Sequence, residues 1–377
     1  MGLLRVLLAM AVIISHCGGI PFLRPVSGST AVEAFFIISG FYMSLILQEK
    51  YCNKPYLLFI TSRFLRLYPI YWTVLIATCL FSLVVYLSSD GQRFPLFDIY
   101  LSVKPAVTAF SFLLLSNLLI AGQDAVMFMG ISRGTGQLYF TGNFWNSDPP
   151  LFQFLLIPQA WSLGLELLFY LLAPFILKKG LKWMIVLMAF SFALRFYLYN
   201  YLGCRNDPWT YRFFPTELLF FLSGNLSYRL YKKIRKRKIP TYISTSLLFF
   251  ILLATTAYAY IPSFKQDCMP FSWNECFYFI SVMTTVPLLF HFLKDRSWDN
   301  HIGELSYPMY ISHLLIARIT AVLPFPWLRQ SWCIALITMG FSCLLVIAIA
   351  RPLEKYRQAR IATAGPRRTS ALRPFPQ

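Results

Sequence analysis

Charged residues are scarce in this chain, and acidic residues are scarcer still. Of 377 residues, 13% are charged, and 15 Asp and Glu stand against 34 Lys and Arg. Water-soluble domains usually carry about 25% charged residues, so this composition argues against a soluble protein. A basic chain can bind nucleic acid. Here, however, the basic residues gather at the ends of apolar runs and in short loops, so we expect no nucleic-acid partner.

Cysteine pairs and metal-ligand clusters are also missing. The eight cysteines include no Cys-x-x-Cys pair, and no His/Cys spacing fits zinc. We therefore expect no metal and no bound cofactor. Cys268 and Cys276 flank one loop, where a disulfide is compatible with the sequence but not required by it.

Long apolar runs are abundant, and 57% of the residues are hydrophobic. Each run is long enough to cross about 30 Å of hydrocarbon. The sequence thus predicts an all-α, polytopic transmembrane helix bundle in a lipid bilayer. A shorter apolar piece lies at 105–121, and the next run, 158–177, is followed by lysines and must therefore end in the cytoplasm. The number of crossings agrees with this only if 105–121 does not cross fully, so we assign it as a re-entrant or interfacial segment. The expected crossings, about ten by this criterion, are 3–20, 31–47, 68–88, 158–177, 183–202, 213–231, 243–262, 274–293, 302–323 and 332–350.

Basic loops set the expected orientation. The connector after the second run and the loop 232–238 are rich in Lys and Arg, so the positive-inside rule places them, and both termini, in the cytoplasm. We expect a membrane domain at 1–355 and a basic, disordered cytoplasmic tail at 356–377, where Pro, Ser and Thr are frequent. The first 14 residues also resemble a signal peptide, but no small-x-small cleavage site follows them.

Arg5 and His16 both lie in the first apolar run. Eleven residues make about three helical turns, so the two side chains leave one face, roughly 16 Å apart along the axis. Ionisable residues inside the membrane are costly and usually functional. The interpretation is a cation near one membrane surface and an acid/base group deep in the bilayer. The alternative is that both side chains satisfy neighbouring carbonyl groups.

Two carboxylates lie in apolar runs and need partners. Glu33 is expected to orient a histidine or pair with an arginine, because an isolated buried carboxylate would otherwise be protonated. Glu166, five residues after Trp161, is expected to have Arg5, His16 or a substrate hydroxyl as its partner. Ser39 precedes Gly40, and this small pair is best explained as a close helix contact.

Further candidates lie on the basic connector and near the C-terminus. Arg63 and Arg66 are three residues apart, hence on one helical face, and arginine forks suit phosphate. Anchoring to anionic lipid explains them equally well. Tyr310 and His313 are also three residues apart, and His313 is either functional or a satisfied structural histidine.

Together these residues resemble acyltransferase family 3, the integral-membrane acetylases of bacterial glycans. The resemblance runs from Arg5 to about residue 355. Two departures exist: Ala31 and Val32 stand where the family often has Gly, and Ser62 replaces the first of two arginines, which leaves one cation fewer. The elements that carry the resemblance are Arg5 with His16, and the runs 35–41, 66–69, 161–171 and 306–313.

The resemblance implies acyl-CoA, usually acetyl-CoA, as a donor substrate and a glycan hydroxyl as acceptor in the bacterial inner membrane. His16 would then deprotonate the hydroxyl for direct attack on the thioester, with Glu166 or Glu33 fixing its tautomer. A relay in which the histidine itself carries the acyl group is the alternative. Arg63 and Arg66 would meet the phosphates, and the thioester arm would pass Arg5. Ser39, Trp161, Tyr310 and His313 are expected to contact substrate.

A transporter or glycan flippase is the rival interpretation, with Arg5, His16 and Glu166 as a proton relay. The sequence shows no repeated halves of the kind common in transporters. A purely structural subunit would leave the intramembrane charges unexplained.

Overall fold

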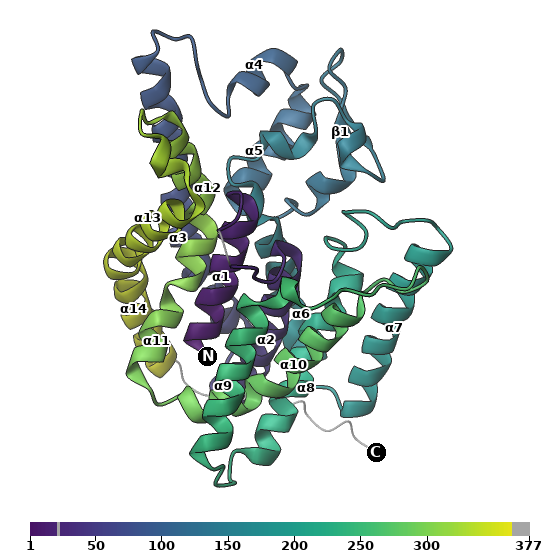
Figure 1. Cartoon of the computed structure of the whole chain (residues 1–377). Coiled ribbons are helices and arrows are strands. Elements are labelled where there is room, and N and C mark those ends of the chain that lie inside the picture. Colours follow the sequence, from purple (N-terminus) through teal and green to yellow (C-terminus); the bar gives the residue numbers. More distant parts are fainter. Residues whose placement is uncertain (21–22, 364–377) are drawn as a thin grey trace, which may run out of the picture.

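The structure is a bundle of helices with a small β hairpin at one end (Figure 1). The computed structural model describes residues 1–20 and 23–363. The hairpin pairs β1 (Met129–Ile131) with β2 (Leu138–Phe140) in antiparallel register. The helices are α1 (Gly2–His16), α2 (Gly28–Glu49), α3 (Tyr56–Ser88), α4 (Asp98–Val103), α5 (Val107–Leu119), α6 (Trp161–Ile176), α7 (Leu181–Asn200), α8 (Phe214–Ile234), α9 (Thr241–Thr256), α10 (Trp273–Leu293), α11 (Ser297–Glu304), α12 (Ser306–Val322), α13 (Ser331–Leu345) and α14 (Arg351–Thr363).

Six helical stretches in the described part of the chain are long and apolar enough to cross a membrane. The prediction of a polytopic helical membrane protein is therefore confirmed, whereas the count of about ten crossings is not. Apolar helices α1, α5 and α9 are shorter. At 13 residues, α5 covers only about 20 Å, which agrees with a segment that does not cross fully. The six stretches are α2, α3, 158–176, α7, α10 and the continuous helix 331–363.

Helices α2 and α8 pack backbone against backbone at the centre of the bundle. A Cβ added to Gly40 would lie 1.9 Å from the carbonyl oxygen of Phe221, and one added to Gly224 would lie 2.0 Å from that of Ile37. Only glycine permits this approach. The predicted close contact at Ser39 and Gly40 is thus confirmed, and its partner is α8.

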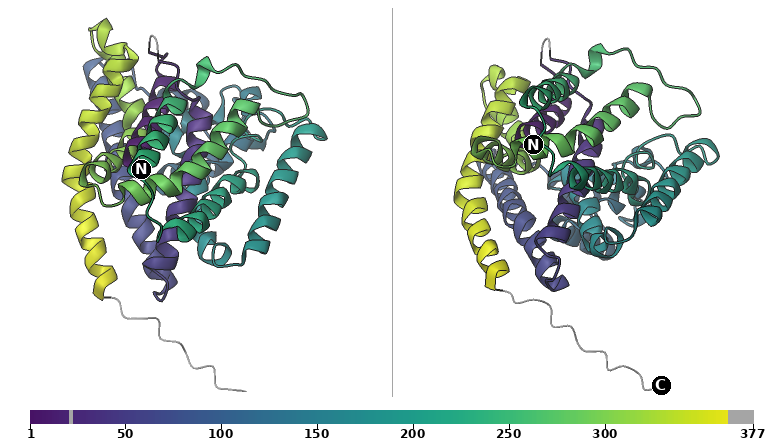
Figure 2. Two further views of the ribbon diagram at one scale, coloured as in Figure 1. Left: turned by 60° about the horizontal axis from the view of Figure 1, so that its bottom comes forward. Right: turned by 90° about the horizontal axis from the view of Figure 1, so that it is seen from below.

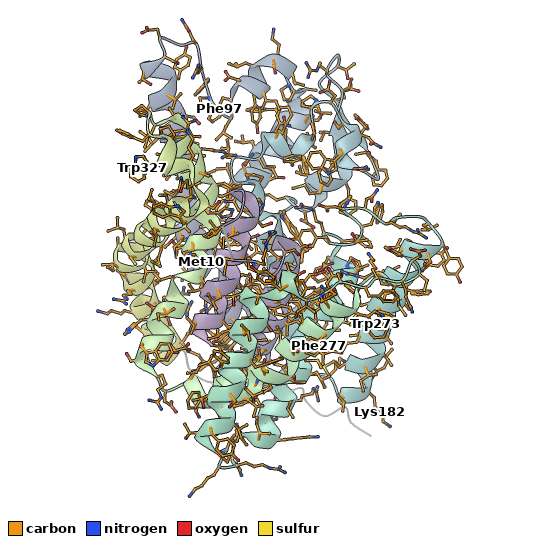
Figure 3. The ribbon with its side chains drawn as sticks, in the orientation of Figure 1. Met10, Phe97, Lys182, Trp273, Phe277 and Trp327 are labelled. Carbon is orange, nitrogen blue, oxygen red and sulfur yellow. The ribbon has the colours of Figure 1, made fainter. Side chains whose placement is uncertain are left out.

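The two ends of the bundle differ in character. The β hairpin and α4 lie at the upper end of Figure 1, while Lys182, at the start of α7, lies at the lower end (Figure 3). Helix α14 runs alongside α3 (Figure 2). The run of Lys and Arg at 232–238, predicted as a loop, starts in the last turn of α8 and continues beyond its end at Ile234.

Several predicted boundaries were wrong. The first helix stops at His16 instead of residue 20, because Gly18 and Gly19 adopt positive φ angles of 93° and 88°. Helix α3 begins at Tyr56, so it includes Arg63 and Arg66 of the basic connector. The run 302–323 divides between α11 and α12.

The predicted disordered tail was also partly wrong. Residues 356–363 continue α14, where Arg357 is buried, and residues 364–377 lie outside the described part of the chain. The optional disulfide does not form: Cys268, Cys276 and the other six cysteines are free.

Candidate active site

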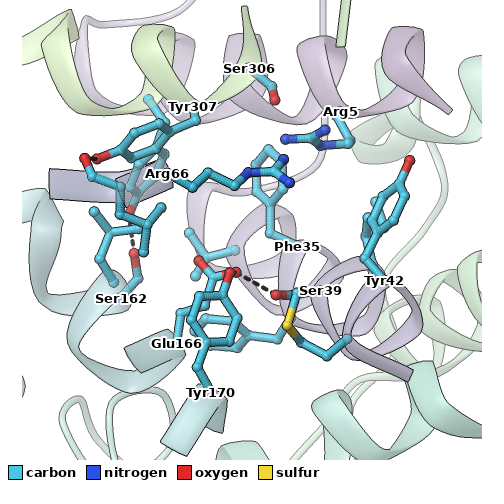
Figure 4. A pocket seen from close by; sticks show the side chains of 17 residues that line it. Arg5, Phe35, Ser39, Tyr42, Arg66, Ser162, Glu166, Tyr170, Ser306 and Tyr307 are labelled. Atoms are coloured by element: carbon cyan, nitrogen blue, oxygen red, sulfur yellow. Dashed lines mark hydrogen bonds between the residues drawn. The ribbon is translucent and has the colours of Figure 1, made fainter. Parts of the chain in front are cut away.

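A cavity with about 780 Å³ of empty space lies between α1, α2, α3, α6 and α12. Glu166 lies within it and accepts hydrogen bonds from the hydroxyl groups of Ser39 and Tyr170 (Figure 4). The guanidinium groups of Arg5 and Arg66 lie on one side of this cluster (Figure 4). The cavity is lined by Arg5, Val32, Phe35, Phe36, Ile38, Ser39, Tyr42, Met43, Arg66, Leu67, Ser162, Leu163, Glu166, Tyr170, Ser306, Tyr307 and Tyr310.

A second cavity, with about 1400 Å³ of empty space, adjoins the first. Both are lined by Arg5, Tyr42, Arg66 and Tyr307, so the two cavities meet at these side chains, and together they are called the passage below. The larger cavity is called the vestibule below. Its remaining lining residues are Leu65, Pro69, Ile70, Asn300, His301, Gly303, Glu304, Pro308, Ala350, Arg351, Leu353, Glu354, Lys355 and Arg357.

Arg5 is held at this junction by the N-terminal turn of α1. The carboxylate of Asp299 on α11 accepts hydrogen bonds from the backbone amides of Gly2, at 2.8 Å, and Leu3, at 3.0 Å. These amides have no hydrogen-bond partner within the helix, so the carboxylate caps them. Its negative charge also interacts favourably with the positive end of the helix dipole. The Arg5 guanidinium lies 5.9 Å from the centre of the Tyr42 ring. The first helix therefore directs a cation into both cavities.

The far end of α1 brings His16 beside His313 of α12. The two ring centres lie 5.1 Å apart. His313 is fully buried, whereas His16 is exposed at the helix end. The expectation that His16 lies deep within its span was therefore wrong, because the helix ends at that residue.

Hydrogen bonds fix the tautomer of each neutral ring. His313 Nδ1 lies 2.7 Å from the carbonyl oxygen of Tyr310, which can only accept, so Nδ1 carries the proton and Nε2 is an acceptor. His16 Nδ1 lies 3.3 Å from that Nε2 and 3.0 Å from the carbonyl oxygen of Val12. His16 must therefore carry its proton on Nδ1. Its Nε2 keeps a lone pair that bonds to no described residue, the state that a general base requires.

Tyr310 links the histidine pair to the cavity. Its ring lines the cavity and lies 6.2 Å, centre to centre, from the ring of His313. Its hydroxyl donates to the carbonyl oxygen of Gln159 at 2.9 Å and lies 2.7 Å from the hydroxyl of Ser162. The prediction that Tyr310 and His313 lie close together on one helix is thus confirmed, while their contact with substrate stays a prediction.

Neither predicted carboxylate orients His16. Glu166 bonds to Ser39 and Tyr170, as described above. Glu33 lies 3.4 Å from Arg195, whose guanidinium also bonds to Glu217, and all three side chains are buried. Of the two partners expected for Glu33, the structure selects an arginine, and His313 takes the place expected for a carboxylate.

Two further predicted residues lie outside the passage. Arg63 is only 4% exposed and packs 5.9 Å from the centre of the Phe59 ring, so it does not line either cavity with Arg66. Trp161 instead packs against Tyr211, and the Arg212 guanidinium lies 4.3 Å from its ring. Burial raises the pKa of the Tyr211 hydroxyl well above its ordinary value, so Tyr211 stays protonated.

Some neighbours of the site were not predicted from the sequence. Gln159 donates to the carbonyl oxygen of Ile311 at 2.7 Å and so ties α12 to the turn before α6. Arg357 lines the vestibule, although the sequence placed it in a disordered tail. Within residues 1–20 and 23–363, no three His, Cys, Asp or Glu side chains group as a metal site.

The structure thus combines a helical membrane bundle, two cavities lined by Arg5 and Arg66, and a histidine pair that lies beside the cavity residue Tyr310. The chain belongs to acyltransferase family 3, since the family model described as an acyltransferase domain matches residues 1–351. A protein of Aquifex aeolicus (strain VF5), described only as uncharacterized, is 27% identical over 210 residues, covering 53% of this chain and 89% of that protein. No solved structure matches the chain.

Proposed function

We propose that this protein is a membrane O-acyltransferase that moves an acyl group, most simply acetyl, from acyl-CoA to a hydroxyl of a glycan. The acceptor is a cell-surface or secreted polysaccharide or a lipid-linked glycan. The observation that carries the proposal is the free Nε2 of His16, held by His313 near a passage whose other end is basic. Membership of an acyltransferase family favours transfer over the transporter alternative.

Acyl-CoA is the donor that suits the passage. Its pantetheine arm is long and narrow, and the cavity between α1 and α6 offers a channel with polar groups at Ser39 and Glu166. Its phosphates are anionic, and Arg5 with Arg66 supply cations at the junction of the two cavities. The donor would therefore enter from the vestibule with its thioester leading.

The proposed chemistry is one direct acyl transfer. His16 Nε2 takes the proton of the acceptor hydroxyl, and the resulting oxygen nucleophile attacks the thioester carbonyl carbon. The carbon–sulfur bond breaks, the sulfur leaves as the CoA thiolate, and the proton on His16 then passes to that thiolate. The products are an O-acyl ester and CoA, and His16 returns to its starting state.

The basic end of the bundle would face the cytoplasm. The loop 232–238 and Lys182 lie at the ends of apolar helices, where the positive-inside rule places cytoplasmic charge. We therefore propose the bacterial inner membrane, with both termini inside and the acceptor approaching His16 from the opposite side.

The test is complementation of a deletion strain followed by NMR of its glycans. The wild-type gene should restore the missing acyl resonances, whereas His16→Ala should lower transfer by about 100- to 10,000-fold, the usual contribution of a general base. His291→Gln on α10, at a histidine that lines neither cavity, is the matched control. Normal acylation by a stably produced His16→Ala protein would overturn the assignment.

A further inference from the structure

Helix α14 forms one wall of the vestibule. Arg351, Lys355 and Arg357 all line that cavity, together with Arg5 and Arg66. The family model ends at residue 351, so Lys355 and Arg357 lie beyond the part of the chain that it matches.

The vestibule holds more positive than negative charge. Arg351 pairs with Glu304 at 3.2 Å, and Arg357 pairs with Glu354 on its own helix. Those two carboxylates are the acidic residues of the lining.

The other cations are not neutralised. Within the described part of the chain, Arg5, Arg66 and Lys355 form no ion pair. Like charges around one cavity repel each other unless an anion enters between them. The lining thus favours a ligand with several negative charges.

Arg357 provides the most specific sign of a ligand. Its side chain is only 7% exposed although it lines the cavity, and its buried Nε has no hydrogen-bond partner. A buried donor without a partner costs free energy, so a native structure that retains one usually supplies the acceptor from elsewhere. Phosphate oxygens are acceptors that match an arginine fork.

We propose that α14 completes a phosphate-binding site, and that the vestibule takes the phosphorylated nucleotide end of acyl-CoA. This inference rests on the proposed function, because it says where the nucleotide end of the proposed donor binds. Lys355 and Arg357 contact the phosphates from α14, while Arg5 and Arg66 face them from α1 and α3. The arm of the same donor then points into the smaller cavity through the shared junction.

The experiment compares two donors, acetyl-CoA and acetyl-pantetheine, which lacks the nucleotide. Lys355→Gln should lower the selectivity for acetyl-CoA, taken as the ratio of the two kcat/KM values, by about threefold, as expected for one exposed charge. Arg357→Gln should lower it by about tenfold or more, as expected for a buried charge-assisted hydrogen bond. Arg360→Gln makes the same charge change on α14 away from the cavity and should leave the selectivity unchanged.

A binding measurement keeps the inference testable without any turnover. Adenosine 3′,5′-bisphosphate should bind the purified wild-type protein and bind Lys355→Gln more weakly, with Arg360→Gln as control. A phospholipid headgroup has the same phosphate chemistry. If Lys355→Gln weakens binding to anionic lipid vesicles but leaves binding of the bisphosphate unchanged, the site is a lipid site and the inference is wrong.

The two proposals fail separately. Acyl transfer with unchanged donor selectivity in Lys355→Gln and Arg357→Gln would refute the role of α14 and leave the proposed function intact. Bisphosphate binding that weakens as expected, in a protein that transfers no acyl group, would refute the proposed function and retain an anionic nucleotide site.

Discussion

Substitutions at His313 separate the two hydrogen bonds of its ring. Asparagine places an amide nitrogen where Nδ1 lies, so His313→Asn keeps the donor to Tyr310 and loses the acceptor for His16. Glutamine reaches the Nε2 position with its carbonyl oxygen, so His313→Gln keeps that acceptor. If His313 acts by orienting His16, the two variants must differ.

The magnitude follows from the bond that is lost. The contact between His313 Nε2 and His16 Nδ1 is one neutral hydrogen bond of 3.3 Å. Such a bond contributes about 0.5–1.5 kcal/mol, or a factor of roughly 2 to 13 in rate. The carbonyl oxygen of Val12, at 3.0 Å, remains as a second acceptor. We therefore expect kcat to fall by about tenfold in His313→Asn and by less than about threefold in His313→Gln.

The assay is the acceptor-dependent release of CoA by purified protein, with the melting temperature in detergent as a control for folding. A merely structural role for His313 would lower the melting temperature in proportion to the loss of rate, with no rescue by glutamine. Equal kcat values for the two variants at equal stability would refute the proposed orientation of His16.

Three further predictions concern the scaffold. Gly224→Ala should lower stability in detergent by about 1–3 kcal/mol because its new Cβ overlaps the backbone of α2, whereas Gly180→Ala meets nothing within 4 Å and should be neutral; equal melting temperatures would contradict this packing. Arg195→Met leaves two buried carboxylates without their cation and should cost about 3–5 kcal/mol, so a melting temperature like that of wild type would argue against the ion cluster. Cys52 and Cys268 are exposed, and an impermeant maleimide should label Cys268 in intact spheroplasts but Cys52 only after permeabilisation; labelling of both without permeabilisation would reject the proposed orientation.

Much of the helical framework follows from the sequence because apolar runs of membrane length have few alternative structures. Local spacing also predicted the arrangement along single helices. Arg5 and His16 lie near opposite ends of α1, and Tyr310 contacts His313 on α12. The close approach of another helix at Gly40 could be predicted because only glycine lacks a Cβ.

Contacts between segments far apart in the sequence could not be predicted in this way. His16 and His313 are 297 positions apart, and their meeting depends on how α1 packs against α12. Glu33 had several candidate arginines, and the packing of α2, α7 and α8 selects Arg195. A helical face is also too coarse to place every side chain, since Arg66 reaches the passage while Arg63 turns into the core.

Transfer across a sealed bilayer tests the central claim most directly. The protein is reconstituted in proteoliposomes with the glycan acceptor inside, and labelled acetyl-CoA is added outside, where only molecules with their basic end outward can bind it. We predict labelled ester on the enclosed glycan with wild-type protein and a loss of about 100-fold or more with His16→Ala. Label that reaches glycan only when donor and acceptor share one side would contradict a passage from the vestibule to His16.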